Sequence, residues 1–129
     1  MPDNPAYSIN MDVKYGPLER VDVPAIEREN REPWFNQTLT RVNDCLVRVG
    51  IFQRGEFHWH KHDNEDEYFH VTSGVLEVDI RAESGAERTV RLQPGQGITV
   101  PKGVVHRTRP VEPCTVLMIE GSGIVPTGD

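Results

Sequence analysis

The chain is predicted to fold as an all-β protein, either an antiparallel barrel or a jelly roll. From Leu39 onward, short runs rich in β-branched residues alternate with turn residues. Glycine and proline recur between these runs at even spacing, which is typical of antiparallel strands that close on themselves. Apolar and charged residues alternate over 76–81, so we expect one face of this strand to line the core and the other to meet solvent.

Residues 1–38 are predicted to form an extended N-terminal arm that is not part of the core. Five of the ten prolines fall at or before Pro33, and the segment lacks a sustained helical or alternating pattern. Residues 25–32 could form one or two helical turns, but they are too few and too charged for a helix that is stable without packing. The barrel is therefore expected to occupy residues 39–129.

Eight short strands are expected within the barrel, each bounded by turn residues. They cover 45–53, 57–62, 67–72, 75–82, 88–92, 97–100, 105–108 and 115–120. Glycine, proline, aspartate, asparagine and serine favour turns for known conformational reasons. They mark the breaks at 63–64, 73–74, 84–85, 94–95 and 101–103.

Length and charge restrict the class of protein. A chain of 129 residues is sufficient for one domain. Its formal net charge of -6 argues against a nucleic-acid partner, because no basic patch is available for phosphates. No apolar run approaches the ~18 residues of a membrane span, and no signal peptide is recognisable. We therefore expect a cytoplasmic protein that has a small molecule as its partner and does not bind a membrane.

Three histidines and one carboxylate predict an open metal site. His60 and His62 are two residues apart, so a strand would place both imidazoles on one face. Glu67 follows shortly afterwards, and His106 lies behind a turn containing proline and glycine. This mixture of nitrogen and oxygen ligands suits Zn, Mn, Fe or Ni, whereas a closed structural zinc site would be expected to use thiolates.

The spacing of these residues resembles the two motifs of the cupin superfamily, which read here as His60-x-His62-x4-Glu67-x6-Gly74 and Gly95-x5-Pro101-x-Gly103-x2-His106. The resemblance covers roughly residues 40–129 and is greatest to the small single-domain cupins. It implies a double-stranded β-helix, or jelly-roll, barrel. It also implies one divalent transition metal ion per chain, held by the three histidines and Glu67.

His58 precedes His60 by two residues, so an unbroken strand would place it on the same inward face. An imidazole that titrates near neutrality suits proton transfer, and His58 is the predicted catalytic residue. The alternative is that the strand bends near Gly55 and that His58 packs as an ordinary side chain. His70 has the opposite parity to Glu67 and is expected on the outer face, without a catalytic role.

Three further positions leave alternatives open. Glu65 competes with Glu67 for the carboxylate role, but the gap of six residues from Glu67 to Gly74 fits the motif better. Arg48 points either inward, where it would pair with a substrate carboxylate, or outward as a solvated charge. Phe69 shares the parity of Glu67 and is expected either to line a ligand pocket or to pack in the core.

The resemblance and the ligand set together predict a metal-dependent enzyme that acts on a small organic molecule, with Fe(II) dioxygenase chemistry as the first interpretation. A redox-neutral isomerase or polyketide-type cyclase that uses Zn, Mn or Ni is the alternative. A third interpretation is a non-catalytic module that binds a small molecule through its metal. We also expect a homodimer, because Trp34 and Phe35 in the arm would gain from burial against a neighbour.

Overall fold

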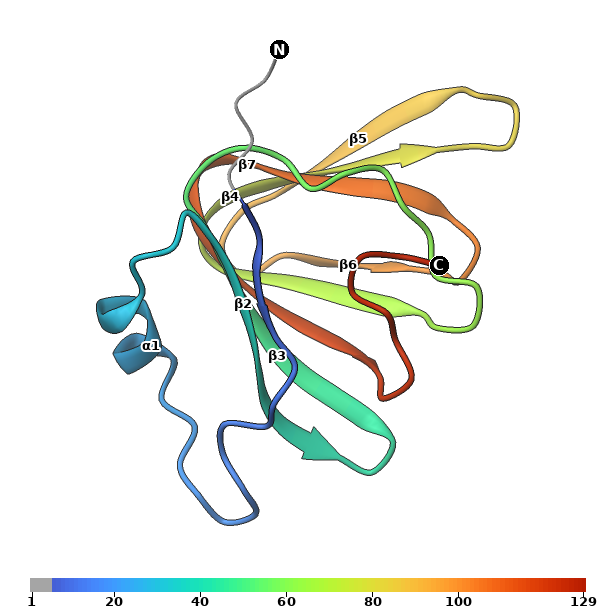
Figure 1. Cartoon of the computed structure of the whole chain (residues 1–129). Coiled ribbons are helices and arrows are strands. Elements are labelled where there is room, and N and C mark those ends of the chain that lie inside the picture. The colour runs from blue at the N-terminus through green and yellow to red at the C-terminus, as the bar shows by residue number, and fades with distance from the viewer. Residues whose placement is uncertain (1–5) are drawn as a thin grey trace.

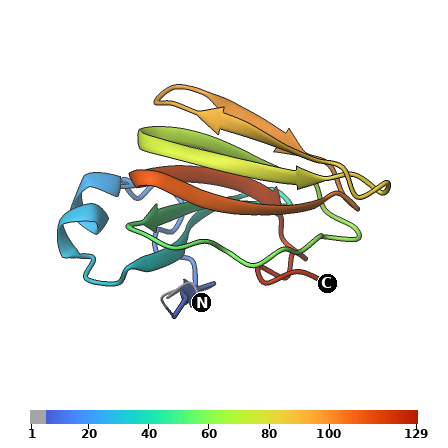
Figure 2. The same ribbon diagram turned by 90° about the horizontal axis from the view of Figure 1, so that it is seen from above.

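The computed structural model describes residues 6–129, whose strands form one curved, mixed sheet (Figure 1). The strand order is β1-β2-β3-β7-β4-β5, and β6 pairs with β4. The sheet curls into a jelly-roll barrel, as predicted, with one short helix outside it (Figure 2). The elements are β1 (Ser8–Asn10), α1 (Val23–Glu29), β2 (Trp34–Val42), β3 (Cys45–Phe52), β4 (Glu67–Arg81), β5 (Glu87–Leu92), β6 (Gly97–Val100) and β7 (Val105–Gly121).

Two long strands replace four of the predicted short ones. β4 spans the predicted strands 67–72 and 75–82, and β7 spans 105–108 and 115–120. The expected break at 73–74 is wrong because the ladder between β4 and β7 continues through it with shifts in register. Gly74 lies there with φ of 75°. Irregularities of this kind accommodate extra residues and bend a strand without ending its pairing.

The predicted strand at 57–62 is also wrong. This segment contacts β7 through an isolated bridge between His60 and His106 and a hydrogen bond from the Phe57 amide to the Thr108 carbonyl, without a continuous ladder. The polypeptide from 53 to 66 instead runs along the open side of the curved sheet, close to the C-terminal segment (Figure 2). The alternation of side chains that a paired strand imposes therefore does not apply to this segment.

The N-terminal part of the chain contributes to the barrel more than predicted. β2 begins at Trp34, so the proposed division at residues 38 and 39 falls inside a strand. The Trp34 side chain is 1% exposed and stacks on Phe52 with ring centroids 4.1 Å apart. Residues 34–38 thus belong to the sheet and not to an extended arm. Before them, α1 begins after Asp22, whose side chain accepts a hydrogen bond from Ala25 N at 3.0 Å.

The main core lies inside the curl of the sheet, where large apolar side chains from β2, β3, β4 and β7 pack together. The alternation predicted for β4 holds for Leu76 and Val78, which are fully buried. Asp79, predicted to meet solvent, is only 4% exposed, because Arg107 and Arg109 of β7 cover its carboxylate with contacts of 2.6 to 2.9 Å. Within residues 6–129, no helix is long and apolar enough to cross a lipid bilayer.

Candidate metal centre

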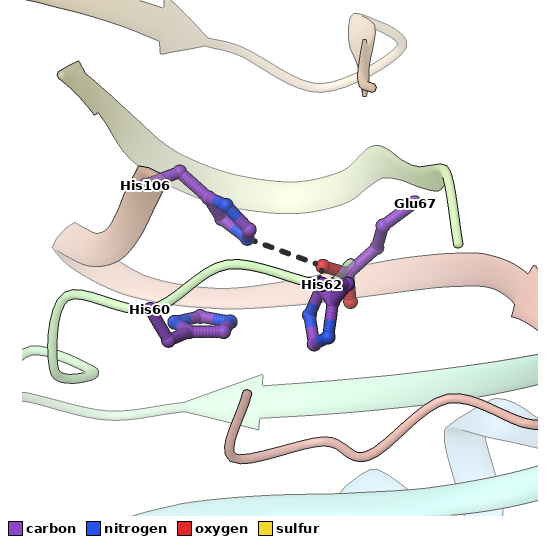
Figure 3. A group of neighbouring side chains, drawn as sticks. All are labelled: His60, His62, Glu67 and His106. Atoms are coloured by element: carbon purple, nitrogen blue, oxygen red, sulfur yellow. Dashed lines mark hydrogen bonds and ion pairs between the residues drawn. The ribbon is translucent and has the colours of Figure 1, made fainter. Parts of the chain in front are cut away.

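Three imidazoles and one carboxylate converge inside the barrel (Figure 3). His60, His62, Glu67 and His106 each offer one ligand atom, and these atoms all lie within 4.8 Å of one another. The imidazole centroids of His60 and His106 are 4.3 Å apart, and those of His60 and His62 are 4.9 Å apart. The four residues that the sequence predicted as ligands are therefore brought together as one group.

Backbone hydrogen bonds between distant segments position these side chains. Glu67 is the first residue of β4, and His106 is the second residue of β7. The backbones of His60 and His106 exchange two hydrogen bonds, of 3.0 and 2.8 Å, which fasten the 53–66 segment to the start of β7. The Gly103 amide donates to the His62 carbonyl at 2.7 Å. Gly103 has φ of 81°, which favours glycine, and the tight turn around it places the start of β7 beside His62.

The orientation of two imidazoles is fixed by carbonyl oxygens. His60 Nδ1 lies 2.9 Å from the His58 carbonyl oxygen, and His106 Nδ1 lies 2.9 Å from the Val104 carbonyl oxygen. A carbonyl can only accept, so both Nδ1 atoms carry the hydrogen and both Nε2 atoms present a lone pair. Such contacts orient histidines and make them better metal ligands.

The donor set fits a cation. His106 Nε2 and His62 Nε2 lie 3.3 and 3.4 Å from the same Glu67 oxygen. A neutral His106 that donates through Nδ1 has no hydrogen on Nε2 for that oxygen, so a lone pair faces a carboxylate. Both ring nitrogens of His62 are buried without a hydrogen-bond partner in the described structure. A bound metal ion would accept one nitrogen lone pair from each histidine and one Glu67 oxygen, which would leave a single His62 nitrogen without a partner.

The pKa values of His60 and Glu67 favour the protonation states that a metal requires of these two ligands. Burial, and secondarily the nearby His106, lower the pKa of His60 to about 4. Burial disfavours the charged form of Glu67, but hydrogen bonds from His106 and His62, which form when a hydrogen and not a metal ion lies between these groups, outweigh burial and hold the pKa of Glu67 well below its usual range. A neutral imidazole and an ionised carboxylate therefore coexist near neutral pH, as metal binding demands.

A cavity of about 30 Å³ adjoins the ligand group. His60, Glu67 and Phe69 form part of its wall, and Phe69 also packs in the main core, so both alternatives left open for that residue hold. The remaining lining is mainly aromatic and apolar, with a few polar groups: Trp34, Asn36, Arg48, Phe52, Phe57, Thr108, Met118 and Pro126. Most small-molecule sites combine an apolar lining with a few placed polar groups.

Arg48 points inward and is only 1% exposed, which decides against the outward alternative. Its Nε donates to Thr38 Oγ1 at 2.9 Å, and its Nη2 donates to Asn36 Oδ1 at 2.6 Å. Its Nη1 lies 3.5 Å from Glu120 Oε1. Burial, and then the neighbouring Glu67 carboxylate, raise the pKa of Glu120 well above its ordinary value.

Glu120 and Trp34 lie beside the site although the sequence did not predict them there. The first is the last residue of the predicted strand 115–120 and shares the parity of Met118 and Val116, which are buried. This shared parity would have predicted that the Glu120 carboxylate points inward. Trp34 was assigned to the arm, and its position in the cavity wall follows from the pairing of β2 with β3, which no local pattern predicts.

His58 does not share the inward face with the ligands, so its predicted orientation is wrong. Its side chain is exposed, and its ring stacks against Phe57 with centroids 4.5 Å apart. Its Nε2 donates to the Thr127 carbonyl at 2.6 Å, which ties the C-terminal segment to this side of the barrel. Because the 57–62 segment has a single bridge to the sheet, at His60, and no continuous ladder, spacing of two residues does not guarantee a common face there.

Two other residues lie outside the ligand group. A side chain at Gly121 would collide with the carboxylate of Glu65, which places Glu65 beside the end of β7 and away from the four ligands. His70 Nδ1 is 2.8 Å from the Tyr68 hydroxyl, and it is not among the ligands. The preference for Glu67 over Glu65 agrees with this geometry.

Comparison with known proteins gives consistent matches. The family model described as "Cupin domain" matches residues 48–120. The uncharacterized protein YdbB from Bacillus subtilis (strain 168) is 39% identical over 85 residues, covering 66% of this chain and 71% of YdbB. A cupin-2 domain containing protein from Shewanella frigidimarina is 28% identical with a TM-score of 0.69, and the match covers 78% of this chain and 93% of that one.

Two other proteins of known structure are less similar in sequence. KdgF from Halomonas sp. is 22% identical with a TM-score of 0.62, and the match covers 76% of this chain and 87% of KdgF. A Bacillus subtilis oxalate decarboxylase is 21% identical with a TM-score of 0.55, covering 62% of this chain and 22% of that protein. At these identities the likeness concerns the fold alone.

Proposed function

The chain belongs to the cupin domain family, and we propose that it is a metal-dependent enzyme that acts on a small organic molecule. His60, His62, Glu67 and His106 would hold one divalent transition metal ion per chain. The observation that carries this proposal is the convergence of four ligand atoms, three of them on buried residues, with both His62 nitrogens unpartnered in the described structure and a mainly apolar cavity beside them. A perturbed ligand group in such a cavity is the usual arrangement of an active site.

Some residues of the site would bind the metal, and others would contact the substrate. When bound, iron would supply redox chemistry with O2, whereas Zn, Mn or Ni would act as a Lewis acid on a carbonyl or enediol. His60 and His106 keep a fixed orientation through the carbonyls that their Nδ1 atoms contact. Phe57 and Phe69 give the cavity apolar walls that exclude water from the reacting molecule.

Oxygenase chemistry remains the first interpretation, supported by the three imidazoles, the single carboxylate and the aromatic lining. The Mn(II) centres of Bacillus subtilis oxalate decarboxylase show that a protein of the same fold uses a divalent transition metal. An isomerase or cyclase with Zn, Mn or Ni is the second candidate, favoured by the same open ligand set. A binding module that holds a ligand without turnover is the third.

The metal hypothesis is tested by elemental analysis of gently purified protein. We expect close to one transition metal ion per chain and a loss of most of it in His62→Ala, because this variant removes a buried ligand. His70→Ala is the matched control, since His70 contacts Tyr68 outside the group. Full metal content in a folded His62→Ala protein would refute the ligand assignment.

The reaction class is tested separately with anaerobically purified, iron-loaded protein. Oxygen uptake on addition of phenolic, diketone or thiol compounds would support the oxygenase interpretation. Conversion of a compound without oxygen uptake would favour the isomerase or cyclase. Saturable binding of a compound that is recovered unchanged would favour the binding module.

A further inference from the structure

One end of the buried Arg48 guanidinium has little to bind. Its Nε donates at 2.9 Å, and its Nη2 makes two contacts, at 2.6 Å to Asn36 and 3.1 Å to the Asn10 carbonyl. Nη1 carries two further hydrogens, and its partner among the described residues is Glu120, at 3.5 Å. The guanidinium is therefore held rigidly by three groups while Nη1 keeps donor capacity within the barrel.

A second buried donor lines the same cavity. Trp34 is 1% exposed, and its Nε1 has no hydrogen-bond partner among residues 6–129. A buried donor without an acceptor is costly and is rare in folded proteins, so a ligand or ordered water is its expected partner. Trp34 and Arg48 both line the cavity that His60 and Glu67 border.

The charges around the cavity do not balance once a metal is present. A divalent ion and Arg48 carry three positive charges together, whereas Glu67 and Glu120 can carry at most two negative ones. An excess of at least one positive charge would remain in a buried site, and a monoanionic ligand would neutralise it. Asn36 and Thr108 add polar groups to the wall without adding charge.

We propose that this cavity is a subsite for the carboxylate of a small organic acid, recognised by Arg48 Nη1 and Trp34 Nε1. The proposal rests on the proposed function, because the metal forms the neighbouring wall. A cavity of about 30 Å³ has room for about two water molecules, which suits a carboxylate head but not a ring. Phe52, Phe57 and Met118 would contact the short carbon chain.

The test compares propionate with propionamide, a neutral molecule of almost the same shape. Both are titrated calorimetrically into zinc-loaded protein at constant ionic strength. We expect propionamide to bind at least about tenfold more weakly than propionate, because it lacks the charge-assisted hydrogen bonds. Arg48→Lys and Trp34→Phe should each weaken propionate binding by at least about tenfold at unchanged zinc content.

Trp59→Phe is the matched control, because Trp59 lies between Arg81 and Arg107, 4.0 and 4.6 Å from its ring centroid, and does not line the cavity. The Trp59→Phe protein should bind propionate with the same affinity as the parent protein. Equal propionate affinities in the parent, Arg48→Lys and Trp34→Phe proteins would overturn the proposal, since the acid would then bind the ion alone. Absence of propionate binding would overturn it too.

The outcome for the metal is read independently of the outcome for the acid. If the protein takes up no zinc, the proposed function fails, and the same titrations on metal-free protein decide about the subsite. Dependence of binding on Arg48 and Trp34 would then support the subsite, and equal or absent binding would refute it. If Arg48→Lys does not fold, Trp34→Phe alone decides, because it keeps an aromatic ring against Phe52 while it removes the donor.

Discussion

His60 carries a stability cost that depends on pH when the metal is absent. Its pKa in the folded state is lowered to about 4, chiefly by burial, whereas an unfolded histidine titrates near ~6.5. Between these values the unfolded chain binds a proton that the folded chain does not, so folding weakens as the pH falls. For this group the loss begins below pH ~6.5 and is complete below the folded pKa.

We therefore predict that metal-free protein loses about 2 kcal/mol of unfolding free energy between neutral pH and pH ~4, after allowance for the partial exposure of His60. Urea unfolding of chelator-treated protein at several pH values measures this loss. His60→Asn should show a flatter profile across the same window. An equally steep profile in that variant would mean that another group is responsible.

At the level of single residues, the sequence predicted the ligand set but not the orientation of every neighbour. The four ligands could be predicted because the motif spacing fixes where β4 and β7 begin and where the turn at Gly103 lies. His58 was misplaced because strand parity was applied to a segment with only one bridge to the sheet. Its contact with Thr127 joins residues far apart in sequence, and no local pattern contains that information.

At the level of elements, Gly74 allows β4 to pass close to β7. It has φ of 75°, and a β-carbon there would lie 2.6 Å from Cys114 Cα and would also collide with the Pro113 carbonyl. Gly85 has φ of 90° but has open space around it. The two glycines thus share a backbone conformation that is unfavourable for residues with a β-carbon, and they differ in the room available for a side chain.

This difference gives a paired prediction for stability. Gly85→Ala should cost about 1 kcal/mol, from the unfavourable φ alone. Gly74→Ala should cost about 3 kcal/mol or more, because the backbone of β7 must also move. Thermal and urea unfolding of the two variants measure both values. Similar costs would indicate that the β4–β7 contact is more adaptable than the structure suggests.

The sequence predicted element types better than element lengths. The alternation over 76–81 correctly indicated a strand, and turn residues marked the ends of β5 and β6 closely. Gly74 was interpreted as a chain reversal, although it serves as an irregularity within one long strand. Local composition cannot distinguish the two, because the difference lies in whether β7 pairs with both halves of β4.

At the level of the whole molecule, we propose that the protein is a homodimer. Trp34 no longer supports this expectation, because it packs in the core of its own chain. The segment between β1 and α1 instead exposes several large apolar side chains, of which Leu18 is fully exposed. Burial of these side chains against a second copy would be favourable.

Light scattering should therefore give about twice the 14.6 kDa mass of one chain. Leu18→Glu should shift the mass towards that of one chain, because it introduces a charge into the apolar segment. Val42→Glu is the matched control, since Val42 is also exposed but lies at the end of β2. A dimer that Leu18→Glu leaves intact would show that another surface forms the interface.

The pairing of β7 with both β3 and β4 would also determine when the protein could acquire the proposed metal ion. During synthesis, His60, His62 and Glu67 leave the ribosome well before His106 and the rest of β7. The nascent chain cannot close the barrel until β7 is available, and sheets with such distant pairings fold slowly. Complete loading of the ion is therefore a late event, which follows synthesis of nearly the whole chain and depends on the metals present at that moment.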